Sequence, residues 1–275
     1  MFEKIKNITL RTLVFLLSSL FFLTGCTTAP APTAGTVASA GTSASSTATS
    51  ATTSAQVIPE VPKKKVAITF DDGPHKEYTI GILNELKKYG FHATFFVVGN
   101  RVDGTAYSGG SALAEAIAGG HEVAIHGYTH TAYYNSCSDE KYAQEINKTV
   151  EAIKGVAPEY DVKLMRPIGG SISNERVTAS PYSIILWNVD SEDWKQKYST
   201  SDSANKKAAK LEKIVDNVMS NVDEGSIILM HDIYESTYDA VKIILARLNA
   251  EGYEVVTVSE LLGDPQPGTK YTKKD

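Results

Sequence analysis

The chain has 275 residues, of which 42% are hydrophobic and 21% charged, and its formal net charge is -5 at pH 7. This composition excludes a chain that is disordered throughout, and the length allows one α/β domain of about 200–250 residues. Lys4, Lys6 and Arg11 outweigh Glu3 within residues 1–25 and give that segment a net charge of +2, so the rest of the chain carries -7. An acidic balance of this size argues against a nucleic-acid partner.

Residues 1–25 have the pattern of a signal peptide for export. The basic residues precede an apolar run over 12–23, which is shorter than the roughly 20 residues that a membrane-spanning helix needs. The sequence Leu23-Thr-Gly-Cys26 follows directly and resembles the bacterial lipobox. The resemblance implies a lipoprotein that is cleaved before Cys26, lipidated on its sulfur, and held on the outer face of the bacterial cell membrane, facing the cell wall. The alternative is an ordinary signal peptide in which Cys26 is incidental.

Residues 26–62 are predicted to form a flexible linker that begins with this cysteine. Positions 27–56 contain nine alanines, nine threonines and six serines, with no charged or aromatic residue. Such a segment cannot bury enough apolar surface to offset the entropy cost of ordering it, which favours a passive tether. The pattern changes at Lys63, and we expect a folded domain over 63–265 followed by a C-terminal tail over 266–275.

Short apolar runs alternate with amphipathic segments throughout the folded domain. The spacing predicts strands over 66–70, 93–98, 122–125, 163–165, 183–187, 226–230 and 254–258. It predicts helices over 78–89, 112–118, 139–154, 204–222 and 238–249. Gly90 is expected to end the first of these helices, and Ser138 to cap the third. Fully apolar strands that alternate with helices imply a parallel sheet covered on both sides, so the predicted fold is α/β, a distorted (β/α) barrel of about seven parallel strands.

Acids, histidines and an arginine follow five of these strands. In chain order they are Asp71 and Asp72, His126 and His130, Arg166, Asp190 and Asp193, and His231 and Asp232. In barrels of this kind, functional residues gather where the strands end and the loops begin. We therefore expect one site at that edge of the sheet.

The residue types at these strand ends favour metal-assisted hydrolysis. One carboxylate with His126 and His130 makes a three-ligand set that suits Zn²⁺ or a similar divalent ion and leaves positions open for water. Because the two aspartates are adjacent, one can bind the metal while the other accepts a proton from the water. His231 is a separate group that could protonate a leaving group.

Five motifs extend this pattern in a fixed order. They are Thr69-Phe-Asp-Asp-Gly-Pro74, His126-Gly-Tyr-Thr-His130, Arg166-Pro-Ile-Gly-Gly170, Asp190-Ser-Glu-Asp-Trp194 and Leu229-Met-His231. Together they resemble the motifs of the polysaccharide deacetylases of carbohydrate esterase family 4, also called the chitooligosaccharide deacetylase homology domain. The likeness covers about residues 64–262, and it implies that the domain over 63–265 is a metal-dependent hydrolase of carbohydrate-bound acetyl groups.

The resemblance also implies a role for each residue. The metal ligands would be Asp72, His126 and His130, with Zn²⁺ as the first choice and Co²⁺, Mn²⁺ or Ni²⁺ as alternatives. The catalytic residues would be Asp71 as general base, His231 as general acid, Arg166 orienting Asp71, and Asp193 orienting His231. The substrate-binding residues would be Gly169, whose N–H stabilises the oxyanion, and Trp194 and Leu229, which wall the acetyl pocket.

Two positions depart from the family pattern, and both bear on substrate preference. Gly127 stands where a serine or threonine usually braces the loop after the first histidine, and Thr129 could supply a hydroxyl in its place. Gly169 stands where a tyrosine is common. Tyr133 belongs to a tyrosine cluster near this loop, for which sugar stacking and surface packing both remain open.

These observations predict a monomeric enzyme whose partners are a polysaccharide and, through Cys26, a membrane. The expected reaction is removal of N-acetyl groups from amino sugars, first from N-acetylglucosamine of peptidoglycan and next from chitin-like oligomers. Two alternatives remain, namely an O-acetyl esterase acting on xylan and a non-catalytic wall-binding module.

Overall fold

The computed structural model describes residues 63–104 and 109–274. The signal peptide predicted for residues 1–25 and the whole linker predicted for 26–62, including the predicted lipidation site Cys26, lie outside the described residues. Among the helices that are described, none has the length and apolar character needed to cross a membrane.

Parallel strands form the centre of the domain, as predicted for a distorted (β/α) barrel. In the described part of the chain, one sheet runs in the order β6-β7-β1-β2-β3-β4-β5-β9, with β8 paired to β1, and all of these pairings are parallel. The strands are β1 Lys64–Asp71, β2 Thr94–Val97, β3 Glu122–Ile125, β4 Leu164–Met165, β5 Ser183–Ile185, β6 Val189–Asp190, β7 Ile227–His231, β8 Tyr253–Val255 and β9 Lys270–Tyr271.

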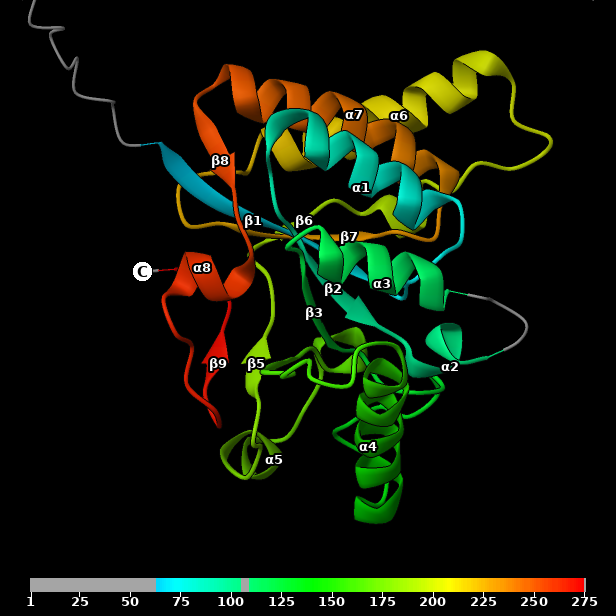
Figure 1. Cartoon of the computed structure of the whole chain (residues 1–275). Helices are drawn as coiled ribbons and strands as arrows, with labels where there is room; N and C mark the ends of the chain where they lie inside the picture. The colour runs from blue at the N-terminus through cyan, green and yellow to red at the C-terminus, as the bar shows by residue number, and fades with distance from the viewer. Residues whose placement is uncertain (1–62, 105–108, 275) are drawn as a thin grey trace, which may run out of the picture. The chain divides into compact units, whose positions relative to one another are not determined.

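Helices connect these strands and cover the sheet. The α-helices are α1 Tyr78–Tyr89, α2 Gly99–Val102, α3 Gly110–Ala118, α4 Asp139–Val156, α5 Asn174–Thr178, α6 Ala204–Met219, α7 Glu235–Ala250 and α8 Val258–Leu262, with short 3-10 turns η1 Ile168–Gly170 and η2 Asp193–Lys195. Helices α1, α6 and α7 lie together on one side of the sheet (Figure 1). Gly90 ends α1 with φ 66°, and the Ser138 side chain accepts a hydrogen bond from the Lys141 N–H at the start of α4, as the sequence predicts.

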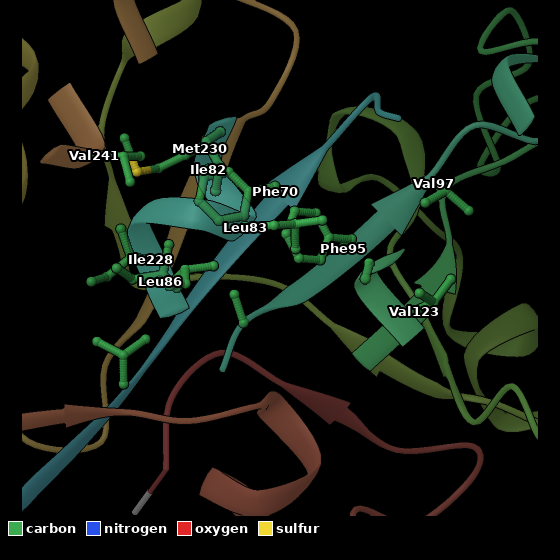
Figure 2. Close-up of a cluster of buried hydrophobic side chains, with 14 of the residues drawn as sticks. Phe70, Ile82, Leu83, Leu86, Phe95, Val97, Val123, Ile228, Met230 and Val241 are labelled. Carbon is green, nitrogen blue, oxygen red and sulfur yellow. The ribbon is translucent and has the colours of Figure 1, made fainter. Parts of the chain in front are cut away.

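Alternation along the strands separates two apolar clusters. Val66, Ile68 and Phe70 of β1 belong to the cluster that packs against the helices, part of which is shown in Figure 2. Ala67 belongs instead to a second cluster, which also contains Phe96, Ala124, Leu164, Ile185, Ile227 and residues of α8. Because successive side chains in a strand point to opposite faces, Asp71 points to the same face as Ala67 and not toward the helices.

The same alternation brings the functional side chains to one face. Asp71 pairs in register with His231 of β7, four residues beyond Ile227. His126 and Arg166 each lie two residues after a member of the second cluster, Ala124 and Leu164. A register slip of one residue would turn a strand's functional side chain toward the helices, so the apolar pattern of each strand also fixes the position of the site.

Several predicted boundaries differ from the structure by a few residues, and two of the differences change the description of the fold. The strand expected over 254–258 ends at Val255, because the Thr257 side chain accepts a hydrogen bond from the Glu260 N–H and begins α8. The tail expected over 266–275 contains β9, which pairs with β5, and Lys273 forms an antiparallel bridge with Ser226. The folded domain therefore extends beyond residue 265. Strands β6 and β9 have two residues each, too short to show an alternating pattern.

Candidate metal centre and active site

The two adjacent carboxylates diverge at the end of β1. Asp71 is the last residue of the strand and is 3% exposed. Asp72 begins the following turn with φ 72°, a left-handed conformation that is uncommon for a residue with a side chain. The change of backbone direction lets the two carboxylates contact different partners. This agrees with the prediction that one aspartate binds the metal while its neighbour acts as the base.

Asp72, His126 and His130 converge on one point. Each offers one ligand atom, and these atoms all lie within 4.8 Å of one another. Oδ1 of Asp72 is 2.9 Å from Nε2 of His130 and 3.5 Å from Nε2 of His126. This oxygen is buried and accepts no well-directed hydrogen bond. One carboxylate oxygen and two imidazole nitrogens at this spacing fit a divalent ion such as Zn²⁺.

The surroundings of His126 suit metal binding. Nδ1 of His126 lies 2.9 Å from the carbonyl oxygen of Arg166, and a hydrogen bond there leaves Nε2 free for the metal. Burial lowers the pKa of His126 despite the nearby carboxylates, which favours the neutral ring that a metal requires. Neither His126 nor His130 lies in a helix, and the chain between them is an irregular, bent loop.

Arg166 holds Asp71 from within the protein. Its guanidinium is fully buried, and Nη1 donates to Oδ1 of Asp71 and to Oγ1 of Thr69, both at 2.7 Å. Nε and Nη2 donate to the carbonyl oxygens of Ile185 and Leu186. Oδ1 of Asp71 is thus occupied by the arginine, while Oδ2 faces the histidines, 3.6 Å from Nε2 of His126.

His231 is held by a second buried carboxylate. Nδ1 of His231 lies 2.7 Å from Oδ1 of Asp193, and Oδ2 of Asp193 accepts hydrogen bonds from the His231 N–H and the Thr237 hydroxyl. Burial lowers the pKa of His231, but the charge and hydrogen bond of Asp193 outweigh it and raise the pKa to about 9. The ring therefore carries a proton at neutral pH and can donate it.

The three predicted substrate-binding residues, Gly169, Leu229 and Trp194, differ in how far they are buried. Gly169 adopts φ 62° within η1 and lies against the ring of Tyr133. Leu229 is 4% exposed, on the strand that ends in His231, whereas Trp194 is 45% exposed. The other two acids after these strands take separate partners. Asp190 accepts a hydrogen bond from the Glu192 N–H, and Asp232 accepts one from the Thr79 hydroxyl.

Glu145 of α4, which lies outside the five motifs, braces the loop between His126 and His130. Its carboxylate is 1% exposed, and Oε2 accepts hydrogen bonds from the N–H groups of Tyr128 and Thr129, both at 2.8 Å. Oε1 accepts one from the Thr129 hydroxyl at 2.6 Å and lies 2.6 Å from Nζ of Lys141. The signal was a carboxylate among apolar residues on the buried stripe of an amphipathic helix, where charged side chains are rare.

The same loop accounts for the glycine at position 127. Gly127 has φ 87°, and a Cβ there would lie 3.0 Å from the hydroxyl oxygen of Tyr134 and 3.3 Å from Oε2 of Glu145. A side chain would be strained in this backbone conformation and crowded by both groups. The bracing that the family usually obtains from the residue after the first histidine is supplied here by Thr129 together with Glu145.

Known proteins share this sequence pattern. The family profile described as polysaccharide deacetylase matches residues 59–181. A peptidoglycan-N-acetylglucosamine deacetylase of Bacillus cereus is 36% identical over 213 residues, which cover 74% of this chain and 91% of that protein. The chain belongs to the polysaccharide deacetylase family. The family predicted from the five motifs is confirmed, while the role of each residue stays a prediction.

Two further relatives of the chain are named for different substrates. The peptidoglycan-N-acetylmuramic acid deacetylase PdaC of Bacillus subtilis is 38% identical over 199 residues, covering 72% of this chain and 39% of that protein. This chain therefore spans well under half the length of that relative. A solved family 4 acetyl xylan esterase from Clostridium thermocellum, in complex with a cobalt ion, is 28% identical with a TM-score of 0.66, covering 76% of this chain and 98% of that one.

Replacing Glu145 should weaken metal binding. Glu145→Ala removes the acceptor of three hydrogen bonds from the loop between His126 and His130, so we expect a fall in Zn²⁺ affinity of about 10–100-fold, measured by competition with a chelator. Glu145→Gln keeps the shape of the side chain and one oxygen acceptor, and should lose less. Glu151→Ala, at an exposed position of the same helix, is the matched control. Equal affinities for the variants at 145 and 151 would contradict the bracing role.

Replacing Asp193 should lower the pKa of His231. We expect NMR titration of the metal-free protein to show a His231 pKa of about 9, and a value lower by about 1–3 units in Asp193→Asn, because burial then acts without the opposing charge. Asp190→Asn removes a carboxylate that does not bond to the His231 ring, and should shift this pKa much less. An unchanged His231 pKa in Asp193→Asn would show that the pair does not set the protonation of the ring.

Proposed function

We propose that the chain is a metal-dependent hydrolase that removes N-acetyl groups from the amino sugars of a polysaccharide, with N-acetylglucosamine of peptidoglycan as its first substrate. One observation carries the proposal. A three-ligand metal site lies beside a carboxylate fixed by a buried arginine and a histidine fixed by a buried aspartate. Relatives named as peptidoglycan deacetylases support the choice of polymer.

The three metal ligands would hold an ion that polarises the acetyl carbonyl and lowers the pKa of the attacking water. Asp71 accepts a proton from that water at Oδ2, while Arg166 keeps Oδ1 in place. The new bond joins the water oxygen to the acetyl carbon, and the backbone N–H of Gly169 donates to the carbonyl oxygen as negative charge grows on it. His231 protonates the nitrogen as the carbon–nitrogen bond breaks, and an amine and acetate leave.

The buried partners make proton transfer in this direction favourable. Oδ1 of Asp71 is ion-paired with the Arg166 guanidinium, whereas the Asp193 carboxylate beside His231 raises the pKa of that ring to about 9. The acid thus begins with the proton that the leaving nitrogen needs. The same arrangement could hydrolyse an ester, and the acetyl xylan esterase relative makes O-acetyl hydrolysis the second candidate.

The decisive experiment measures acetate released by the metal-loaded chain from residue 27 onward. Peptidoglycan, chitin oligomers and acetylxylan are compared in parallel, and peptidoglycan should give the highest kcat/KM. A chelator should abolish release, and activity should fall as the pH rises through about 9, where His231 loses its proton.

Asp71→Asn is the matched variant for this experiment. It should keep its metal and lower kcat about 10²–10⁴-fold, the range for loss of a general base. Preference for acetylxylan would support the esterase instead. Bound metal without release of acetate from any of the three substrates would favour a wall-binding module.

We propose that the enzyme is a monomeric lipoprotein anchored through Cys26 on the outer face of the membrane. The short apolar run at 12–23 and the tetrapeptide ending at Cys26 support this location. A lipid anchor on a tether of this composition would keep the domain within reach of the cell wall.

Cys26→Ser should therefore stop lipidation and processing in cells. We expect the variant to accumulate as uncleaved precursor that incorporates no labelled fatty acid, while the wild-type chain is labelled and shortened. Globomycin, which inhibits the lipoprotein signal peptidase, should make wild-type chain accumulate as lipidated precursor. Normal cleavage of both chains in its presence would show that residues 1–25 are an ordinary signal peptide.

A further inference from the structure

Tyr133 is an exposed aromatic residue to which the proposed mechanism gives no task. Among the described residues, the large hydrophobic side chains that stand out into solvent are Tyr133, at 57% exposed, and Trp194, at 45%. A single exposed apolar side chain is ordinary on a protein surface. The contacts around Tyr133 therefore have to show whether this exposed ring has a role in binding.

The ring of Tyr133 lies beside the assigned oxyanion donor. A Cβ on Gly169 would lie 3.3 Å from Cε1 and 3.8 Å from Cδ1 of Tyr133. The tyrosine ring thus stands directly next to the position at which this chain lacks the common tyrosine of the motif. An aromatic ring is present on this side of the site, but it comes from the loop after β3.

The loop that carries Tyr133 is firmly anchored. Tyr134 is fully buried, and its backbone bridges to Ile172, just beyond η1. Arg176 of α5 donates hydrogen bonds to the carbonyl oxygens of Tyr134 and Cys137, both at 2.7 Å. The carbonyl oxygen of Tyr133 itself accepts the Cys137 N–H. A ring on such a fixed backbone loses little conformational entropy when a ligand packs against it.

The two exposed rings flank the catalytic strand. Trp194 follows β6, which lies on one side of β1 in the order of the sheet. Tyr133 follows β3 and lies against Gly169 after β4, and both of these strands are on the other side of β1. A glycan chain laid across Asp71 along this direction would meet one aromatic ring on each side of the reacting sugar.

We propose that Tyr133 is a substrate-binding residue whose ring packs against a pyranose ring of the glycan on the Gly169 side of the site. This inference rests on the proposed function. A pyranose ring has a face of C–H groups and a rim of hydroxyls, which match the apolar face and the polar edge of a tyrosine. Tyr133 therefore takes part in choosing the sugar that occupies this side, and it does so from outside the five motifs.

The test distinguishes the contribution of the Tyr133 ring to glycan binding from the contributions of its size and of its hydroxyl group. Tyr133→Leu keeps apolar cover over Gly169, Tyr133→Phe keeps the ring, and Trp194→Leu is the comparison on the other side. Each is made in the metal-loaded chain and also in an Asp71→Asn background. Calorimetry then measures the Kd for a tetrasaccharide of peptidoglycan glycan without turnover, and acetate release gives KM and kcat.

We expect Tyr133→Leu to raise both Kd and KM about tenfold with a much smaller change in kcat, and Tyr133→Phe to stay within about twofold of the parent in Kd. Wild-type binding by Tyr133→Leu would overturn the inference, and so would a loss in Tyr133→Phe as large as that in Tyr133→Leu. No binding of the tetrasaccharide by the Asp71→Asn parent would overturn it as well. If the wild-type chain binds the tetrasaccharide but releases no acetate, the deacetylase proposal is refuted. The inference about Tyr133 is still tested in that case, because it depends on the Kd values.

Discussion

The buried ion pair between Arg166 and Asp71 is the interaction on which the rest of the site depends. Burying a guanidinium is costly, and here Asp71, Thr69, two backbone carbonyl oxygens and the ring of Phe96, 4.1 Å away, offset that cost. The carbonyl oxygen of the same arginine is also the hydrogen-bond partner of His126. Removing the guanidinium would leave a buried carboxylate unpaired, a cost of about 3–5 kcal/mol. One residue thus holds both the proposed base and a metal ligand.

The three aspartates of the site have different proposed roles because each contacts a different partner. Asp71 meets an arginine, which leaves one oxygen free to accept a proton. Asp72 is one residue later and meets histidines. Burial raises its pKa, but the electrostatic effect of the close His130 ring, and of His126 and His231 nearby, more than compensates and holds that pKa well below its usual range. Asp193 is buried with His231 and keeps that ring charged. Strand register sets this distribution, because it decides which partner each acid meets.

Much of this arrangement could be predicted from the sequence, because the apolar pattern of each strand and the residues at its end are local signals. The helix over 78–89 and the cap at Ser138 are local in the same way. The contacts that were missed join distant parts of the chain. Glu145 meets a loop 16 residues before it, and β9 has only two residues and is recognisable only through β5. In the sequence, Gly127 departs from the serine or threonine that the family usually has at this position. The reasons for the glycine, its positive φ and the neighbouring Glu145 carboxylate, are visible only in the structure.

The position of Tyr133 indicates how substrate choice could change without changing the chemistry. The groups proposed to move protons and hold the metal lie at strand ends, where register and burial limit substitution. Tyr133 lies instead on a loop that Arg176 anchors from α5, so its ring can be replaced without disturbing the ion pair beneath the metal site. Loops tolerate such exchange better than strands do. The glycine at position 169 and the ring at position 133 then form one feature, in which a loop supplies the aromatic surface that the motif lacks.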